Sequence, residues 1–272
     1  MEKTYKRVMT IAGSDPSGGA GVQADIKTIS ALGCFATSAI VAVVDENTVG
    51  VTGVHPVPVD FVVGQIRSVL DDIGTDAVKI GMLHSSELIR AVRRVLDEYP
   101  ALRDIVLDPV MVATSGDPLL QADAVATLRE ELLPRARVIT PNIPEAELLL
   151  GREIGSQDQL PDAARELARF GASVLLKAGH LAASESELVD IFYNAETGRL
   201  TRLASPRVET RNTHGTGCTL SSAFASQLAL GRPLDDAAAA AKAYIAAAIA
   251  AGAPYRIGRG HGPVHHFHAL WQ

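Results

Sequence analysis

The sequence predicts an α/β protein whose mostly parallel sheet is covered by helices on both faces. Short runs rich in Val, Ile and Leu alternate along the chain with longer amphipathic stretches. Most positions in these runs are apolar, without a strict alternation of apolar and polar residues, which is typical of strands buried on both faces of a parallel sheet. With a hydrophobic fraction of 47%, residues 1–272 can bury a large core as a single domain.

Six apolar runs are predicted to be strands, and helical patterns separate them. The strands are expected at residues 8–12, 37–44, 77–80, 105–108, 138–140 and 174–177. The helices between them are expected at residues 21–32, 60–73, 87–98, 122–133, 144–150 and 160–170. An antiparallel hairpin at the sheet edge and two closing helices are expected at residues 188–193 with 199–204, and at 217–230 and 234–251.

Composition excludes several functional classes. A net charge of −6 argues against a nucleic-acid partner that needs a broad basic face. The two cysteines, Cys34 and Cys218, are too few for a secreted disulfide framework. No signal peptide is recognised, and the apolar stretch at residues 237–253 is mostly alanine and contains Lys242, which favours a packed helix over a membrane span. We therefore expect a cytoplasmic protein with no membrane partner.

Glycines and polar residues follow the predicted strands at their carboxyl ends. In parallel α/β sheets, ligands bind in the crevice beyond these ends. The sequence therefore predicts a site assembled from several strand ends. The segments concerned are residues 13–15, 45–47, 81–82, 108–109, 141–142 and 179–180.

The glycine-rich segment GSDPSGGAG at residues 13–21 joins a predicted strand to a predicted helix. It is not a Walker A loop, because Gly19-Ala20 stands where that motif requires Lys followed by Ser or Thr. Two interpretations remain open: a flexible turn, or a turn whose backbone approaches a small ligand, with Asp25 on the helix behind it.

The segment NTHGTGCT at residues 212–219 opens another predicted helix. Free N–H groups at a helix start, together with glycines, form an anion-binding site. A thiol in such a first turn is expected to have a lowered pKa, so Cys218 could accept a proton from an alcohol. The alternative is an ordinary helix start with an inert buried cysteine.

Three charged residues near the strand ends are candidates for binding a metal-nucleotide complex. Glu145 lies in TPNIPE, residues 140–145, where a first-turn carboxylate also serves as a helix cap. Glu145 and Asp108 could hold Mg²⁺ with its waters. Lys177 could contact nucleotide phosphates, and the alternative for it is an ordinary surface lysine.

The C-terminal segment contains His261, His265, His266 and His268. No cysteine or carboxylate accompanies these histidines, so metal binding is the less favoured interpretation. We expect a packed segment that includes Phe267 and Trp271.

Together these motifs resemble the hydroxymethylpyrimidine/phosphomethylpyrimidine kinases of the ribokinase superfamily. The resemblance implies a ribokinase-like three-layer α/β/α sandwich and a homodimer. It also implies that Mg²⁺ and ATP phosphorylate 4-amino-5-hydroxymethyl-2-methylpyrimidine, and then its monophosphate, in thiamine pyrophosphate biosynthesis. The similarity runs from about residue 8 to the C-terminus and rests on residues 13–25, 79–82, 107–112, 115–120, 140–142, 177–180, 212–221 and 262–268.

The same resemblance implies roles for individual residues. Cys218 would be the proton acceptor, where many superfamily members have Asp, and the backbone of Gly215, Thr216 and Gly217 would complete the anion hole. The other implied sites are a pyrimidine pocket of Gly13, Asp25, Glu46, Met82 and Val110, an ATP site of Asn142, Lys177 and Thr213, and a metal site of Asp108 and Glu145.

Two residues depart from the family pattern. Glu46 stands where the family usually has Gln, and an ionised carboxylate only accepts hydrogen bonds. We therefore expect Glu46 to change the pH optimum or the preferred pyrimidine. Thr114 stands where many members have Lys, which removes a positive charge from the loop at residues 111–120, a plausible lid.

Three other functions are compatible with parts of the sequence to different degrees. A pyridoxal or pyridoxine kinase of vitamin B6 salvage shares the fold and the cysteine. Sugar kinases of the same superfamily fit less well, because their base is normally Asp. A catalytically silent sensor of a pyrimidine or nucleotide is disfavoured, since Cys218, Asn142 and Glu145 are all retained.

Overall fold

A computed structural model describes residues 3–111, 123–179, 181 and 186–271. Strands β1 to β10 lie in two sheets. The main sheet contains β1 (Arg7–Ala12), β2 (Phe35–Ile40), β5 (Ala77–Ile80), β6 (Ile105–Leu107), β7 (Val138–Ile139), β8 (Ser173–Leu176), β9 (Glu187–Asn194) and β10 (Arg199–Pro206).

The eight strands follow the order β10-β9-β8-β7-β6-β5-β1-β2. From β2 to β8 all neighbours are parallel, whereas β9 is antiparallel to both β8 and β10. The mostly parallel sheet and the antiparallel edge hairpin expected from the sequence are therefore confirmed.

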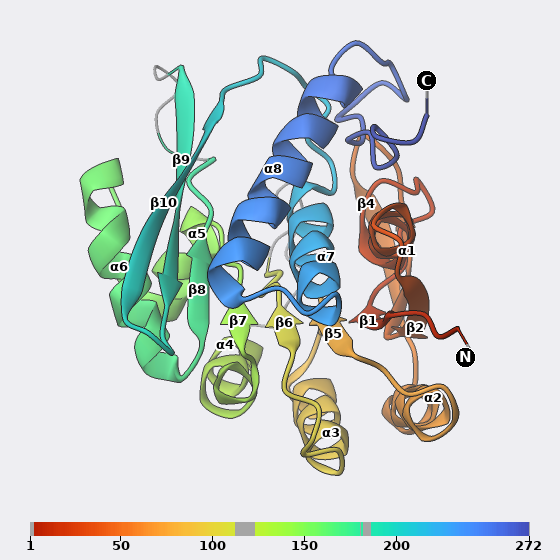
Figure 1. The fold of residues 1–272 in the computed structure, drawn as a ribbon. Coiled ribbons are helices and arrows are strands. Elements are labelled where there is room, and N and C mark those ends of the chain that lie inside the picture. Colours follow the sequence, from red (N-terminus) through yellow and green to blue (C-terminus); the bar gives the residue numbers. More distant parts are fainter. Residues whose placement is uncertain (1–2, 112–122, 180, 182–185, 272) are drawn as a thin grey trace.

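Helices cover both faces of the sheet, which makes three layers (Figure 1). One layer contains α1 (Gly21–Ala31), α7 (Thr216–Ala229) and α8 (Leu234–Gly252). The other contains α2 (Val59–Asp72), α3 (Ser86–Asp97), α4 (Ala124–Thr127), α5 (Ile143–Leu150) and α6 (Leu160–Leu167). Each layer encloses its own apolar cluster. On the α7 side, for example, Phe192 of β9 meets Phe224 with ring centroids 5.8 Å apart.

The prediction of a single strand at residues 37–44 is wrong. After β2 and Val41, the chain enters β3 (Ala42–Glu46), which pairs antiparallel with β4 (Val51–Pro56) in a separate two-stranded sheet. Ala39, Val41 and Ala42 are all buried in one cluster, so the apolar run continues through the change of sheet. Strand β4 was not predicted. Its residues are mostly exposed, so its sequence, VTGVHP, lacks the apolar run by which the buried strands were recognised.

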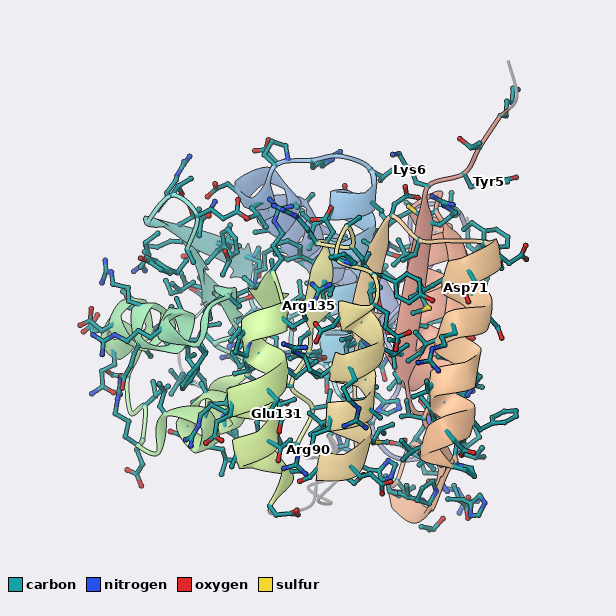
Figure 2. All side chains as sticks on the ribbon, turned by 90° about the horizontal axis from the view of Figure 1, so that it is seen from below. Tyr5, Lys6, Asp71, Arg90, Glu131 and Arg135 are labelled. Carbon is teal, nitrogen blue, oxygen red and sulfur yellow. The ribbon has the colours of Figure 1, made fainter. Side chains whose placement is uncertain are left out.

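The helix predicted at residues 122–133 is also irregular. Residue 122 lies outside the described part of the chain, and α4 passes into a π turn at Leu128–Leu132 and a 3₁₀ turn at Leu133–Arg135. Arg90 of α3 pairs with Glu131 of the π turn, Nε to Oε1, at 2.8 Å (Figure 2). Two further 3₁₀ turns flank α6, at Gln157–Gln159 and Ala168–Phe170.

The C-terminal segment is packed at Val264 and His266, which are buried, whereas Trp271 is 65% exposed, so the expected packed segment is found only in part. Phe267 stacks on Trp271 with ring centroids 4.8 Å apart, and His268 lies 4.9 Å from the ring of Tyr244 on α8. Within residues 3–271, as far as they are described, no helix has the length and apolar character needed to cross a membrane.

Candidate active site

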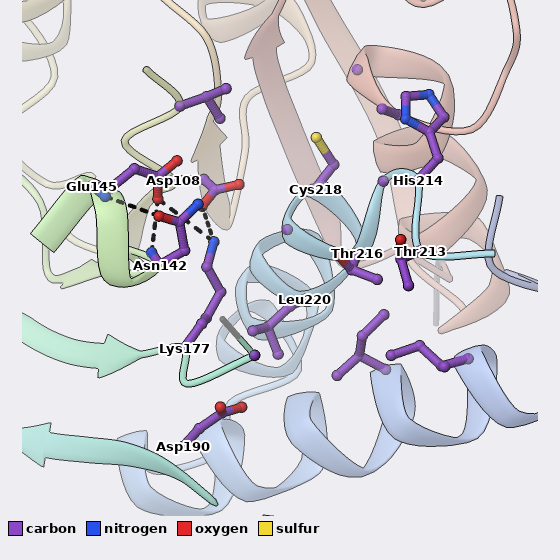
Figure 3. A pocket seen from close by; sticks show the side chains of 18 of the residues that line it. Asp108, Asn142, Glu145, Lys177, Asp190, Thr213, His214, Thr216, Cys218 and Leu220 are labelled. Atoms are coloured by element: carbon purple, nitrogen blue, oxygen red, sulfur yellow. Dashed lines mark hydrogen bonds and ion pairs between the residues drawn. The ribbon is translucent and has the colours of Figure 1, made fainter. Parts of the chain in front are cut away.

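A cavity of about 690 Å³ lies at the carboxyl ends of the central strands, beside the start of α7 (Figure 3). Strands β1, β5, β6, β7 and β8 all end at its wall. Every predicted site residue except Asp25 lines it. These lining residues are Gly13, Glu46, Met82, Asp108, Val110, Asn142, Glu145, Lys177, Thr213, Gly215, Thr216, Gly217 and Cys218.

The two glycine-rich loops interlock at the side of this cavity. Asp15 accepts hydrogen bonds from the N–H groups of Ser17, Gly19 and Ala20 at 2.7, 3.0 and 2.6 Å. Its Oδ2 also lies 2.8 Å from Nε2 of His214 in the second loop. A Cβ on Gly215, whose φ is +78°, would stand 1.8 Å from the carbonyl oxygen of Gly19. Hydrogen bonds within the first loop and to the second loop hold this turn in place, which favours the interpretation as a ligand-facing turn over the flexible one.

Asp15 and His214 each shift the pKa of the other. Burial would raise the pKa of Asp15, but the hydrogen bonds from His214, Ser17 and Ala20 hold that pKa well below its usual range. Burial would lower the pKa of His214, but Asp15 and the more distant Glu46 outweigh it and raise that pKa. The pair therefore favours a protonated imidazole facing an ionised carboxylate.

Asp15, Glu46 and His214 could also present one ligand atom each within 4.8 Å of one another. The Oδ2 atom of Asp15 already accepts hydrogen bonds from two backbone N–H groups and faces His214. We therefore assign this cluster to holding the loops together.

Asp25 lies beneath the cavity instead of in its wall. It is fully buried and accepts hydrogen bonds from Lys79 at 2.8 and 2.9 Å, from Thr10 at 2.6 Å and from Ser222 at 2.7 Å. Lys79, which sequence analysis missed, lines the floor of the cavity. Burial opposes its charge, but Asp25 more than compensates and raises the pKa of Lys79. The sequence signal that could have identified Lys79 is its position as the single charged residue within the apolar strand at residues 77–80.

Lys177 connects two carboxylates across the cavity. Its Nζ lies 2.9 Å from Oδ1 of Asp108 and 3.9 Å from Oε2 of Glu145 (Figure 3). A Cβ on Gly217 would lie 3.1 Å from Oδ2 of Asp108 and 3.3 Å from Nζ of Lys177. The glycine thus lets the first turn of α7 approach this ion pair. Lys177 has a side chain only 16% exposed, so the surface-lysine interpretation is wrong.

Glu145 closes a capping box and also faces the cavity. Its N–H donates to Oδ1 of Asn142 at 2.9 Å, and its Oε2 accepts from the N–H of Asn142 at 2.8 Å. Burial raises the pKa of Glu145 to about 7; Lys177 opposes this shift and Asp108 adds to it. A cation bound beside it would stabilise the ionised form.

Cys218 is the third residue of α7, and Figure 3 shows its side chain directed into the cavity. The expectation of a lowered pKa is wrong. Burial raises the pKa of the thiol to about 11, Lys79 opposes that shift, and Asp25 and Asp108 add to it. At neutral pH the free protein therefore carries a thiol here, because desolvation and two carboxylates outweigh the favourable position at a helix start.

A second region of the same cavity was not predicted. It lies between β9, the end of β10 with the segment that follows it, and α8, and its lining mixes apolar and polar side chains with a buried Asp190–Lys242 ion pair. The sequence signal for this region is Lys242, the single charged residue within the alanine-rich stretch at residues 237–253. The other residues of this region include Leu188, Ser205, Pro206, Arg207, Val208, Glu209, Thr210, Ile245, Ala246 and Ile249.

Some predicted features lie outside the described residues. They are Thr114, the remainder of the plausible lid at residues 112–120, and His180.

The chain is similar in sequence and in fold to known small-molecule kinases. The family model described as phosphomethylpyrimidine kinase matches residues 15–265. A hydroxymethylpyrimidine/phosphomethylpyrimidine kinase from Rhizobium meliloti is 51% identical over 266 residues, covering 97% of this chain and 98% of the relative. A thiamine biosynthesis bifunctional protein from Geobacter sulfurreducens is 50% identical over 260 residues, covering 95% of this chain and 52% of the relative. The crystal structure of an ADP complex of Bacillus subtilis pyridoxal kinase superposes with a TM-score of 0.89 and 35% identity, covering 99% of this chain and 100% of the other.

Proposed function

This chain belongs to the phosphomethylpyrimidine kinase family, and we propose that it phosphorylates 4-amino-5-hydroxymethyl-2-methylpyrimidine with ATP, and then converts the monophosphate to the pyrophosphate. The product serves thiamine pyrophosphate biosynthesis. One observation carries the proposal: a single cavity brings together a helix start suited to phosphate, a Lys177–Asp108 pair and the side chain of Cys218.

The start of α7 supplies the anion site. The first N–H groups of a helix have no partners within the helix, and its dipole places about half a positive charge there. Gly215 and Gly217 allow close approach of this turn to the neighbouring loop and to Lys177. Phosphoryl transfer depends mainly on positioning and charge stabilisation, so these groups address its main requirement.

We assign the proton-acceptor role to Cys218. As the hydroxymethyl oxygen bonds to the γ-phosphorus of ATP, the bond between that phosphorus and the β,γ-bridging oxygen would break and ADP would leave. The hydroxyl proton would pass to the Cys218 sulfur, which must be a thiolate to accept it. A pKa of about 11 makes that form a minor one at neutral pH in the free protein. The buried Lys79 is the cation that favours it.

Asp108 and Glu145 fit Mg²⁺, because they are buried carboxylates facing the cavity and the pKa of Glu145 is raised to about 7 by burial and Asp108. When bound, Mg²⁺ would neutralise phosphate charge. Asn142 and Thr213 complete the proposed nucleotide contacts, and the ADP complex of the pyridoxal kinase supports a nucleotide at this fold.

The pyrimidine is assigned to the region around Gly13, Val44, Met82, Val110 and Glu46. A Cβ on Gly13 would approach the Met82 methyl group to 2.7 Å, so a larger residue would narrow this region. The carboxylate of Glu46 supplies an acceptor for an amine or a protonated ring nitrogen.

The test is turnover with Mg²⁺-ATP on hydroxymethylpyrimidine, its monophosphate and pyridoxal, with ADP release measured and products identified by mass. Conversion through to the pyrimidine pyrophosphate is the expected result. Pyridoxal kinase is the second candidate, because the Bacillus subtilis enzyme shares the whole fold at 35% identity. Faster turnover of pyridoxal than of both pyrimidines would overturn the proposal.

We further propose that residues 1–272 act as one ribokinase-like domain, as a cytoplasmic homodimer. The continuous eight-stranded sheet supports a single domain, and the free Cys34 and Cys218 suit a reducing compartment. Light scattering coupled to size-exclusion chromatography tests the dimer, and a monomeric mass at micromolar concentration would reject it.

A further inference from the structure

The buried ion pair of the second cavity region joins two elements that are distant in sequence. Nζ of Lys242, on α8, lies 2.8 Å from Oδ2 of Asp190, on β9. The two side chains are 9% and 7% exposed. Burying two charges is expensive, and such pairs are weak contributors to stability compared with apolar packing. A specific role near the ligand is a better account of this pair than stability.

The second oxygen of Asp190 reaches the main chain beside Lys177. Oδ1 accepts a hydrogen bond from the N–H of Ala178 at 2.8 Å. The backbone pairing between β8 and β9 ends at Leu176 and Ile191. Just beyond it, the Asp190 side chain accepts the hydrogen bond of the Ala178 N–H in place of a backbone carbonyl. On the other side, the N–H of Lys177 donates to the carbonyl of Pro141 at 2.9 Å. The backbone at Lys177 is thus fixed from both neighbouring strands.

We propose that the Lys242–Asp190 pair is a positioning device for nucleotide binding. Asp190 fixes the Lys177–Ala178 backbone, so that the Lys177 ammonium stays between Asp108 and the start of α7. Lys242 neutralises the Asp190 carboxylate, which would otherwise repel nucleotide phosphates in the same cavity. The inference rests on the proposed function in that it assigns this cavity to a nucleotide.

The first test is steady-state kinetics of Lys242→Met with saturating pyrimidine. We expect KM for ATP to rise about tenfold or more, with kcat and KM for the pyrimidine changed less than about threefold. Arg232→Met, which removes an exposed positive charge just before α8, is the matched control and should leave all three constants unchanged. An unchanged KM for ATP in folded Lys242→Met would overturn the proposal.

Two further variants separate this role from direct contact and from loss of folding. Asp190→Asn keeps an acceptor for Ala178 and leaves the Lys242 charge, so KM for ATP should not rise. The double variant Asp190→Asn/Lys242→Met has no uncompensated charge and should recover KM for ATP to within about threefold of wild type. A double variant as poor as Lys242→Met would show that Lys242 contacts the nucleotide itself, and would reject the proposal.

Calorimetric titration with ADP separates the inference from the proposed reaction. Weaker ADP binding by Lys242→Met and recovery in the double variant would support the positioning role even if no pyrimidine is phosphorylated. Absent pyrimidine turnover by the wild-type protein would instead reject the proposed function alone.

Discussion

Nε2 of His214 lies 2.8 Å from Oδ2 of Asp15, and this contact joins the two glycine-rich loops across 199 residues of sequence. Both side chains are almost fully buried. Asp15 also organises its own loop through three backbone N–H groups. The Asp15–His214 contact therefore helps to fix the position of the loop at residues 13–21 relative to the start of α7.

The Asp15–His214 pair should give stability a characteristic pH dependence. Asp15 has a lowered folded pKa, so its contribution is present above the unfolded value near ~3.9 and is lost as pH falls further. His214 has a raised folded pKa, so its contribution is complete below ~6.5 and is lost as pH rises through the folded value. Urea unfolding of wild type and His214→Gln should differ most between about pH 4 and 6.5. A difference that grows toward about pH 9 would contradict the assignment.

Replacing Cys218 by Ala should remove most turnover while the fold persists. General-base catalysis typically contributes ~10²–10⁴-fold to rate, and the loss should lie in that range. Because the pKa of Cys218 is raised to about 11, the wild-type rate should climb up to about tenfold per unit between about pH 7 and 9 as thiolate forms. The Cys218→Ala profile should be flat. Near-normal turnover in this variant would reject the assignment of the base.

The substitution Glu46→Gln should change substrate preference. A carboxylate only accepts hydrogen bonds, whereas an amide also donates, so the two side chains suit different protonation states of an aminopyrimidine. Glu46 also lies 3.9 Å from Nε2 of His214, so loss of its charge should lower the pKa of that imidazole. Turnover of hydroxymethylpyrimidine and pyridoxal across pH tests this; identical profiles and preferences would count against it.

Gly215→Ala should disrupt the loops, because its Cβ would stand 1.8 Å from the carbonyl oxygen of Gly19 and its φ is +78°. We expect a loss of about 2 kcal/mol or more of unfolding free energy together with loss of turnover. Gly64→Ala, in α2 with open space around its Cβ, is the control and should raise stability by about 0.4–1 kcal/mol. Comparable unfolding midpoints for the two variants would contradict the interlocked loops.

Glu145→Gln tests the proposed cation site without removing the helix cap. The glutamine carbonyl can still accept from the N–H of Asn142, so the melting temperature should change by only a few degrees. Removing the charge should raise the Mg²⁺ concentration needed for half-maximal turnover about tenfold. An unchanged Mg²⁺ requirement would exclude Glu145 from the cation site.

The sequence was sufficient for the architecture because apolar strands and amphipathic helices leave local patterns. The prediction of one strand at residues 37–44 was wrong. The residues on both sides of the break between β2 and β3 are buried in one apolar cluster, so the apolar pattern does not show that the chain enters a second sheet. All predicted site residues except Asp25 line one cavity, since parallel strand ends converge on one crevice.

What the sequence by itself determined was therefore the layered fold, the crevice and the family resemblance, all of which follow from local pattern and motif. Only the tertiary structure decided the electrostatics. The pKa of Cys218 is raised, not lowered, because burial desolvates the thiol and Asp25 and Asp108 add to the shift. Asp25 is buried against Lys79, and Lys242 reaches Asp190. Coulombic and desolvation effects depend on distance and burial, which sequence order does not contain.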